Sequence, residues 1–194
     1  WQELKSSIEN DQAPYKFAVI KTDCEACYTT PAWEAHCTTE GLEHDFSSRY
    51  RHDKNGDIER AMQAIGVPFR CMMIQGNAPS DIEHERFALN HANVIRNYSP
   101  TKANNGRSPK EKKAGMKLPI NKRLLRGPLF CLVVIHVYEE ERPKHAPRGL
   151  TGVYCGYDDR NDVYLVKEWV SGQTYYTHDV TFYPNIFPYR SNPD

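Results

Sequence analysis

The feature that most constrains this chain is a run of short β-strand candidates in its last third. These candidates are rich in Val, Tyr, Ile and Thr, and they cover residues 129–138, 149–157, 162–168 and 173–182. Between them lie residues 139–143, 158–161 and 171–172, which contain the Asp, Asn, Pro, Ser and Gly typical of turns. Short strands at this regular spacing predict a small all-β barrel.

Aromatic side chains accompany these strand candidates. We interpret them as core residues and cross-strand pairs, although aromatic rings of this kind could also stack on nucleic-acid bases. The aromatic residues considered are Tyr154, Tyr157, Tyr164, Trp169, Tyr175, Tyr176 and Phe182.

The first half of the chain has a different texture, in which strand and helix patterns alternate. Residues 15–22 and 42–47 predict strands, and a Thr-Pro start and a Gly end predict a helix over 31–40 between them. Residues 49–57 predict a polar loop, followed by a helix over 58–74.

A second long helix is predicted to end near Tyr98. Ser80 and Glu83 have the spacing of a capping box, which places its start near residue 80. Its expected core stripe comprises Ile82, Leu89, Ala92 and Ile95.

Two carboxylates in this half have the placement of metal ligands. Asp23 follows the predicted strand 15–22, and Glu59 lies at the start of the predicted helix 58–74. A carboxylate at the end of a strand and another on a later helix can share a divalent metal, as in two-metal phosphoryl transfer. Carboxylate oxygens suit Mg²⁺. A pair of solvated acidic residues is the ordinary alternative.

Short sequence words in a fixed order strengthen the first interpretation. They are Ile20-Lys21-Thr22-Asp23, Glu40-Gly41-Leu42-Glu43-His44, Ser47-Ser48-Arg49-Tyr50, Asn55-Gly56-x-x-Glu59-Arg60, Asn97-Tyr98-Ser99-Pro100, Gly106-Arg107-Ser108-Pro109, Gly152-Val153-Tyr154-Cys155-Gly156-Tyr157 and Asp179-Val180-Thr181-Phe182. In this order they resemble the integrase of Ty1/copia-type retrotransposons, from the middle of its catalytic core into the segment that follows.

The resemblance implies a fold and a division of the chain. Residues 1–100 would be the latter part of an RNase H-like α/β integrase core, residues 101–126 a basic linker, and residues 127–190 an SH3-like β-barrel. It also implies DNA integration by Mg²⁺- or Mn²⁺-dependent polynucleotidyl transfer. Asp23 and Glu59 would be the catalytic metal ligands, and Asn55 and Gly56 would shape the active-site loop.

Two departures from the family lead us to expect no catalysis from this chain alone. The family's first catalytic Asp would precede Trp1, and residues 24–26 read Cys-Glu-Ala where the family usually has glycine. Glycine allows a backbone to approach a ligand closely. The alternative is a non-catalytic, integrase-derived structural or interaction subunit of a larger nucleoprotein assembly.

The predicted linker is strongly basic. Between residues 102 and 126 there are nine basic residues and one acidic residue, Glu111. Such a run is either a solvated linker or a surface that contacts nucleic-acid phosphates. The basic residues are Lys102, Arg107, Lys110, Lys112, Lys113, Lys117, Lys122, Arg123 and Arg126. Because family integrases act as multimers, we also expect self-association or a larger assembly.

Composition adds limits. The 25 basic and 25 acidic residues balance, and no apolar run is long enough to cross a membrane. Six cysteines in 194 residues indicate reduced thiols rather than a disulfide scaffold, so we expect an intracellular protein, with the nucleus as a candidate location. Cys24, Cys27, His36 and Cys37 could supply zinc ligands, but the adjacent pair at 36 and 37 suits one ion poorly.

Overall fold

The computed structural model describes residues 16–22, 25–46, 56–119, 121–138, 144–145 and 147–190, together with Gln2, Lys5, Ser6 and Glu9. The chain divides into two compact units, residues 1–60 and residues 61–194. Among the helices of the described residues, none has both the length and the apolar character of a bilayer span.

The first unit contains a short parallel pair of strands. β1 (Val19–Thr22) pairs with β2 (Glu43–Phe46), with Val19 opposite Glu43. A 3₁₀ turn, η1 (Ala26–Thr29), and helix α2 (Pro31–Thr39) connect them. The predicted strand–helix–strand order is confirmed, because parallel neighbours require such a crossover.

The predicted start of α2 is also confirmed. The hydroxyl of Thr30 accepts a hydrogen bond from the backbone N–H of Trp33 at 3.3 Å, and Pro31 occupies the first turn. Proline suits that position because its missing N–H has no helical partner there. After the helix, Gly41 adopts a φ of 65°, a conformation that favours glycine.

Helix α3 (Gly56–Gly76) is longer at both ends than its predicted range of 58–74. Its last residue, Gly76, belongs to the second unit and packs closely within it: a Cβ on Gly76 would lie 2.8 Å from the Phe130 side chain. A larger residue at position 76 would therefore force Phe130 to move.

Helix α4 (Ile82–Tyr98) begins where predicted, but a different residue caps it. The N-cap is Asp81, whose carboxylate accepts hydrogen bonds from the backbone N–H groups of Glu83 and His84 at 3.0 and 2.9 Å. The predicted Ser80–Glu83 capping box was therefore wrong by one residue. The Asp81 carboxylate also lies within hydrogen-bond distance of Nδ1 of His84, at 2.8 and 2.7 Å.

The predicted core stripe of α4 was half right. Ala92 is buried and Ile95 packs against the core, whereas Ile82 is 88% exposed and Leu89 is 45% exposed. The buried face instead follows positions i, i+3, i+4, i+7 and i+8, the spacing of one helix side. It comprises His84, Phe87, Ala88, His91 and Ala92. Two histidines and two alanines in this set hid the face from a search for large aliphatic residues.

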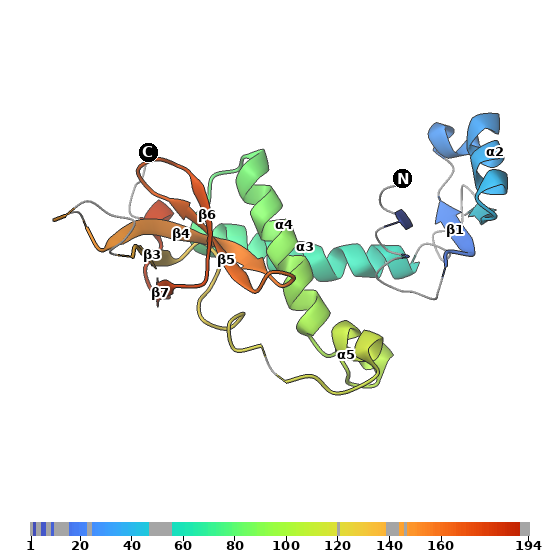
Figure 1. Cartoon of the computed structure of the whole chain (residues 1–194). Helices are drawn as coiled ribbons and strands as arrows, with labels where there is room; N and C mark the ends of the chain where they lie inside the picture. Colours follow the sequence, from blue (N-terminus) through green and yellow to red (C-terminus); the bar gives the residue numbers. More distant parts are fainter. Residues whose placement is uncertain are drawn as a thin grey trace. The chain divides into compact units, whose positions relative to one another are not determined.

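The second unit is built on a five-stranded antiparallel sheet in the order β6-β5-β4-β3-β7 (Figure 1). Helix α4 packs on β4. The strand bounds are β3 Leu132–His136, β4 Gly149–Asp158, β5 Val163–Glu168, β6 Thr174–Thr177 and β7 Val180–Tyr183. Four strands were predicted. The fourth, 173–182, is two strands. β6 pairs with β5, and β7 pairs with β3 at the opposite edge of the sheet.

Close packing in the sheet explains one glycine. A Cβ on Gly152 would lie 2.7 Å from the backbone oxygen of Lys167 on β5. Real Cβ atoms do not approach backbone so closely, so this position admits only glycine without a shift of the strands.

Aromatic rings form the centre of this unit, as expected. Tyr154 and Tyr164 are each 1% exposed, and the ring of Phe182 lies 5.1 Å from both ring centroids. Edge-on contacts at such distances are favourable beyond the area they bury. Trp169 and Tyr176 depart from the expectation, since they are 42% and 65% exposed.

Candidate nucleic-acid interface

The basic segment that follows α4 is folded locally rather than extended. A bridge between Thr101 and Arg107 closes a tight loop around the 3₁₀ turn η3 (Lys102–Asn104). The short helix α5 (Pro109–Ala114) then begins with a capping box, in which Ser108 and Glu111 exchange side-chain-to-backbone hydrogen bonds. The single acid of the segment thus serves the helix start, and hydrogen bonds from the backbone lower the pKa of Glu111.

The first anchor of this segment to the sheet is Lys110. Its ammonium donates to the hydroxyl of Tyr98 at 2.6 Å and forms an ion pair with Asp159 in the β4–β5 turn. It also lies 4.4 Å from the centre of the Tyr98 ring. Partial burial alone would lower the pKa of Lys110, but the bonds to Asp159 and Tyr98 outweigh it and raise that pKa. Lys110 therefore remains a cation held by its own carboxylate.

The second anchor is Arg123, which forms an ion pair with Asp162 at 3.1 Å. Between the two anchors, the Asn121 amide donates to the hydroxyls of Tyr98 and Tyr157 at 3.4 and 3.2 Å. The Tyr157 hydroxyl in turn donates to Asp162. Burial and the nearby Asp162 carboxylate raise the pKa of Tyr157 to about 12, so it stays a neutral donor.

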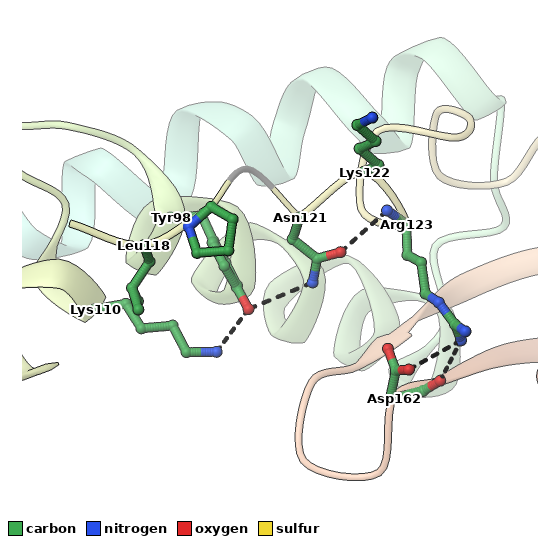
Figure 2. Close-up of a pocket in the computed structure, with 8 residues that line it drawn as sticks. Tyr98, Lys110, Leu118, Asn121, Lys122, Arg123 and Asp162 are labelled. Atoms are coloured by element: carbon green, nitrogen blue, oxygen red, sulfur yellow. Dashed lines mark hydrogen bonds and ion pairs between the residues drawn. The ribbon is translucent and has the colours of Figure 1, made fainter. Parts of the chain in front are cut away.

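These residues enclose a groove of about 540 Å³ (Figure 2). Its polar groups already bind one another, as the dashed lines in Figure 2 show. The network holds the basic segment against the sheet and fixes where the remaining cations stand. Lining residues are Tyr98, Lys110, Leu118, Pro119, Asn121, Lys122, Arg123 and Asp162.

The other basic residues of the segment point to solvent. Among the described residues, Lys112, Lys117 and Lys122 are exposed and have no carboxylate within ion-pair distance. Side chains of this kind can reach phosphate without first breaking an internal ion pair. Also exposed are Lys102, Arg107, Lys113 and Arg126.

The predicted catalytic residues lie in the first unit and are only partly described. Strand β1 ends at Thr22, directly before Asp23, and Glu59 is exposed near the start of α3. Gly56 is the first residue of α3, and its carbonyl accepts from Arg60 at 3.0 Å. Asp23 and Asn55 lie outside the described residues. The pairing of Asp23 with Glu59 therefore stays a prediction.

The zinc hypothesis also stays a prediction. Cys27 is exposed and Cys37 is buried, whereas Cys24 lies outside the described residues. Within the described part of the chain, no three His, Cys, Asp or Glu side chains come close enough together to hold a metal ion. The predicted turn at 139–143 and residues 49–55 of the predicted polar loop 49–57 also fall outside the described part, and the last two residues of that loop lie in α3 instead.

Sequence reasoning missed the acidic and aromatic half of the network. The sequence predicts a turn that contains Asp159 and precedes Asp162, and it places Tyr98 at a helix end and in a family-like sequence word, but it assigns none of the three a binding role. A signal did exist: a basic stretch followed by a sheet with carboxylates at one turn allows charge pairing between them. Sequence alone could not show which basic residue forms an ion pair with which carboxylate.

Comparisons with known proteins agree with this architecture. Residues 131–194 match the family described as retroviral polymerase SH3-like domain. The chain is 23% identical over 182 residues to the retrovirus-related Pol polyprotein from transposon TNT 1-94 of Nicotiana tabacum, a match that covers 94% of this chain and 13% of the polyprotein.

Two solved structures are also similar. One is a simian T-cell lymphotropic virus intasome in complex with PP2A regulatory subunit B56 gamma, at 15% identity and a TM-score of 0.44, covering 93% of this chain and 63% of that one. The other is the catalytic core domain of BIV integrase, at 20% identity and a TM-score of 0.40, covering 59% and 70%.

The class of protein follows from the family match and the sheet: the second unit contains a retroviral polymerase SH3-like domain. More particularly, the resemblance found in the sequence is confirmed, and the chain is related to the integrase-type region of retrotransposon and retroviral Pol polyproteins.

Proposed function

We propose that this chain is a nucleic-acid-binding part of a Ty1/copia-type integrase, and that the basic segment 102–126 contacts DNA phosphates. The observation that carries the proposal is that the basic residues of the segment have two different roles. Lys110 and Arg123 fasten the segment to the sheet through Asp159 and Asp162. Lys112, Lys117 and Lys122 stay exposed on the fastened segment. Cations held in place lose less freedom on binding than cations on a loose tail.

The proposal extends to the first unit as the latter part of an RNase H-like core, within residues 1–100. Asp23 and Glu59 would hold Mg²⁺ or Mn²⁺, with Asn55 and Gly56 shaping the loop beside them. The exposed carboxylate of Glu59 near the start of α3 fits access by a hard cation. When bound, such ions activate a hydroxyl or water and stabilise the leaving oxygen. The chain's own contribution is to present these carboxylates on a strand end and a helix start.

A charge-reversal experiment tests the phosphate contacts. Lys112, Lys117 and Lys122 are changed to Glu together, leaving both anchors intact, and affinity for a DNA duplex is measured at several salt concentrations. We expect weaker binding and a shallower salt dependence, by about 0.9 in the logarithmic slope for each lysine that contacts phosphate. Lys110 is kept, because reversing it would also break the ion pair with Asp159.

The control is an equal charge change elsewhere. Lys16, Lys144 and Arg148 are exposed outside the basic segment, and their reversal to Glu alters the net charge by the same amount. If both triple variants lose affinity equally, the effect is one of total charge and the basic segment has no specific role.

A second function, a structural or interaction subunit, is favoured by apolar side chains on the surface of the second unit. Ile74, Ile82 and Val170 are 76%, 88% and 89% exposed. Exposed apolar side chains that gather into one contiguous patch favour a partner or a second copy of the chain. Sedimentation of the chain without DNA tests this: a stable dimer or larger assembly supports it, and a monomer at high concentration contradicts it.

A further inference from the structure

A second cavity, of about 440 Å³, lies in the same unit beside the groove already described. Helix α4 forms one wall, and the end of β4 with the β4–β5 turn forms the other. Asp159 belongs to this wall and also holds Lys110 of the groove. The cavity therefore borders the basic segment. None of the predicted metal ligands or of the basic residues 102–126 lines it, but two of the aromatic residues considered for base stacking, Tyr157 and Tyr176, do.

A buried histidine without a partner lies in the wall of this cavity. His91 is 4% exposed, and within the described residues its ring makes no hydrogen bond. A Cβ built on Gly156 would lie 3.9 Å from Nδ1 of His91, which is ordinary van der Waals contact. Gly156 has a φ of 140°, which other residues rarely adopt. The wall of the cavity at this point is therefore a glycine backbone beside the polar atom of the ring.

The rim of the cavity carries unused hydrogen-bonding groups. Asn90, Asn93 and Asn97 share one face of α4, all three are exposed, and none has a hydrogen-bond partner among the described residues. Tyr176 on the edge strand β6 adds a ring that is 65% exposed. Side-chain amides can donate to and accept from the edge of a base, and an exposed ring can stack on its face.

The charges of the wall show which part of a nucleotide fits. The lining carries Asp158, Asp159 and Arg160, and Asp159 is paired with Lys110. Hydrogen bonds from Asn161 and the turn backbone lower the pKa of Asp158. This wall has no excess of positive charge to attract a phosphate. An uncharged ring needs none, and its phosphates would lie toward the exposed lysines of the neighbouring segment.

We propose that the cavity between α4 and the β4–β5 turn binds one unpaired nucleobase, with Asn93 and Asn97 contacting its edge, Tyr176 its face and His91 its inner end. This site rests on the proposed nucleic-acid function, because it takes a base from the strand whose phosphates the basic segment contacts. It adds to that function a preference for DNA in which a base is out of the duplex.

The first experiment uses a probe without phosphate, so it is independent of the basic segment. Adenosine is titrated into the full chain while side-chain amide signals of the three asparagines and ring signals of His91 are followed by NMR. Shifts confined to these groups, absent in a titration with inorganic phosphate, are expected. No shift at these groups, or equal shifts with phosphate, would overturn the proposal.

The second experiment compares a paired duplex with the same duplex carrying one extrahelical base. The wild-type chain should bind the second DNA about tenfold more tightly, the value of one good base contact. The double variant Asn93→Ala/Asn97→Ala should lose that preference and keep its affinity for the paired duplex. Alanine favours helix at these exposed positions, so folding is retained, and circular dichroism verifies it.

Leu89→Ala on the same helix is the control, since Leu89 does not line the cavity. A wild-type chain that binds both DNAs equally, or a double variant that keeps the preference, would overturn the base site and leave the phosphate role standing. If the charge-reversed variant of Lys112, Lys117 and Lys122 lost all DNA binding but still showed the adenosine shifts, the base site and the phosphate contacts would be separate sites.

Discussion

At the scale of single residues, the second unit contains polar atoms in apolar surroundings. Tyr154 is 1% exposed and His91 is 4% exposed, and among the residues that the structure describes neither the Tyr154 hydroxyl nor Nδ1 of His91 has a hydrogen-bond partner. The two rings lie 5.6 Å apart in an edge-on contact between α4 and β4. Burying a polar atom without a partner costs free energy, so both residues offer sharp tests of the packing.

Removing the Tyr154 hydroxyl should not harm the fold. We expect Tyr154→Phe to leave the free energy of unfolding unchanged or to raise it by about 1 kcal/mol, because it removes an unpaired buried group and keeps the ring. Urea unfolding measures this. Tyr98→Phe is the contrast: the Tyr98 hydroxyl binds Lys110, Asn121 and Asp159, so its loss should destabilise the chain. A clear loss from Tyr154→Phe would mean that its hydroxyl does have a partner.

His91 should make stability depend on pH. Burial lowers the pKa of His91 from 6.5 to about 4, so the unfolded chain binds this proton more tightly than the folded chain. The contribution of neutral His91 is complete above about pH 6.5 and is lost as the pH falls toward 4. At pH 4.5 the loss should be about 2 to 3 kcal/mol.

The measurement is urea unfolding at pH 7.5, 5.5 and 4.5 for the wild type and for His91→Gln, which does not titrate. The variant should lose less stability than the wild type over this range. His136→Gln, at an exposed histidine, serves as the control and should follow the wild type. Equal pH slopes for all three proteins would place the acid sensitivity elsewhere.

At the scale of elements, helix starts were the most predictable feature and helix faces the least. The start of α2 follows from Thr30 and Pro31 alone, because capping is local chemistry. Which residues form the inner face of α4 depends on the element that packs against the helix. His91 belongs to this face, and it contacts Tyr154 of β4. Likewise, nothing local in residues 173–182 shows that β6 and β7 pair with different strands. The basic segment was predictable, whereas its carboxylate partners in the β4–β5 turn were not.

The cap of α4 can be tested directly. Asp81→Ala should lower the free energy of unfolding by about 1 kcal/mol, because two backbone N–H groups and the His84 ring lose their acceptor. Asp81→Asn keeps a capping oxygen and should lose less. Thermal unfolding of the two variants against Ser80→Ala decides between the two cap positions. A larger loss from Ser80→Ala would restore the predicted capping box.

At the scale of the whole molecule, the expectation for catalysis differs from the expectation for DNA binding. We expect no Mg²⁺-dependent strand transfer from this chain alone, because the resemblance requires a third carboxylate beyond Asp23 and Glu59. The assay compares the wild type with Glu59→Gln, using Glu34→Gln on α2 as the control. Strand transfer by the wild type that Glu59→Gln abolishes and Glu34→Gln retains would contradict the expectation and assign Glu59 a catalytic role.

The pairing of β7 with β3 has a consequence for how the second unit forms during synthesis. Thr181 and Phe182 lie opposite Val134 and Val133, so this edge of the sheet cannot form until β7 has been synthesised. Contacts between segments so distant in sequence slow folding. Until β7 arrives, β3 presents an unpaired strand edge, which invites aggregation. Premature termination before Val180 should therefore yield insoluble product rather than a shorter working domain.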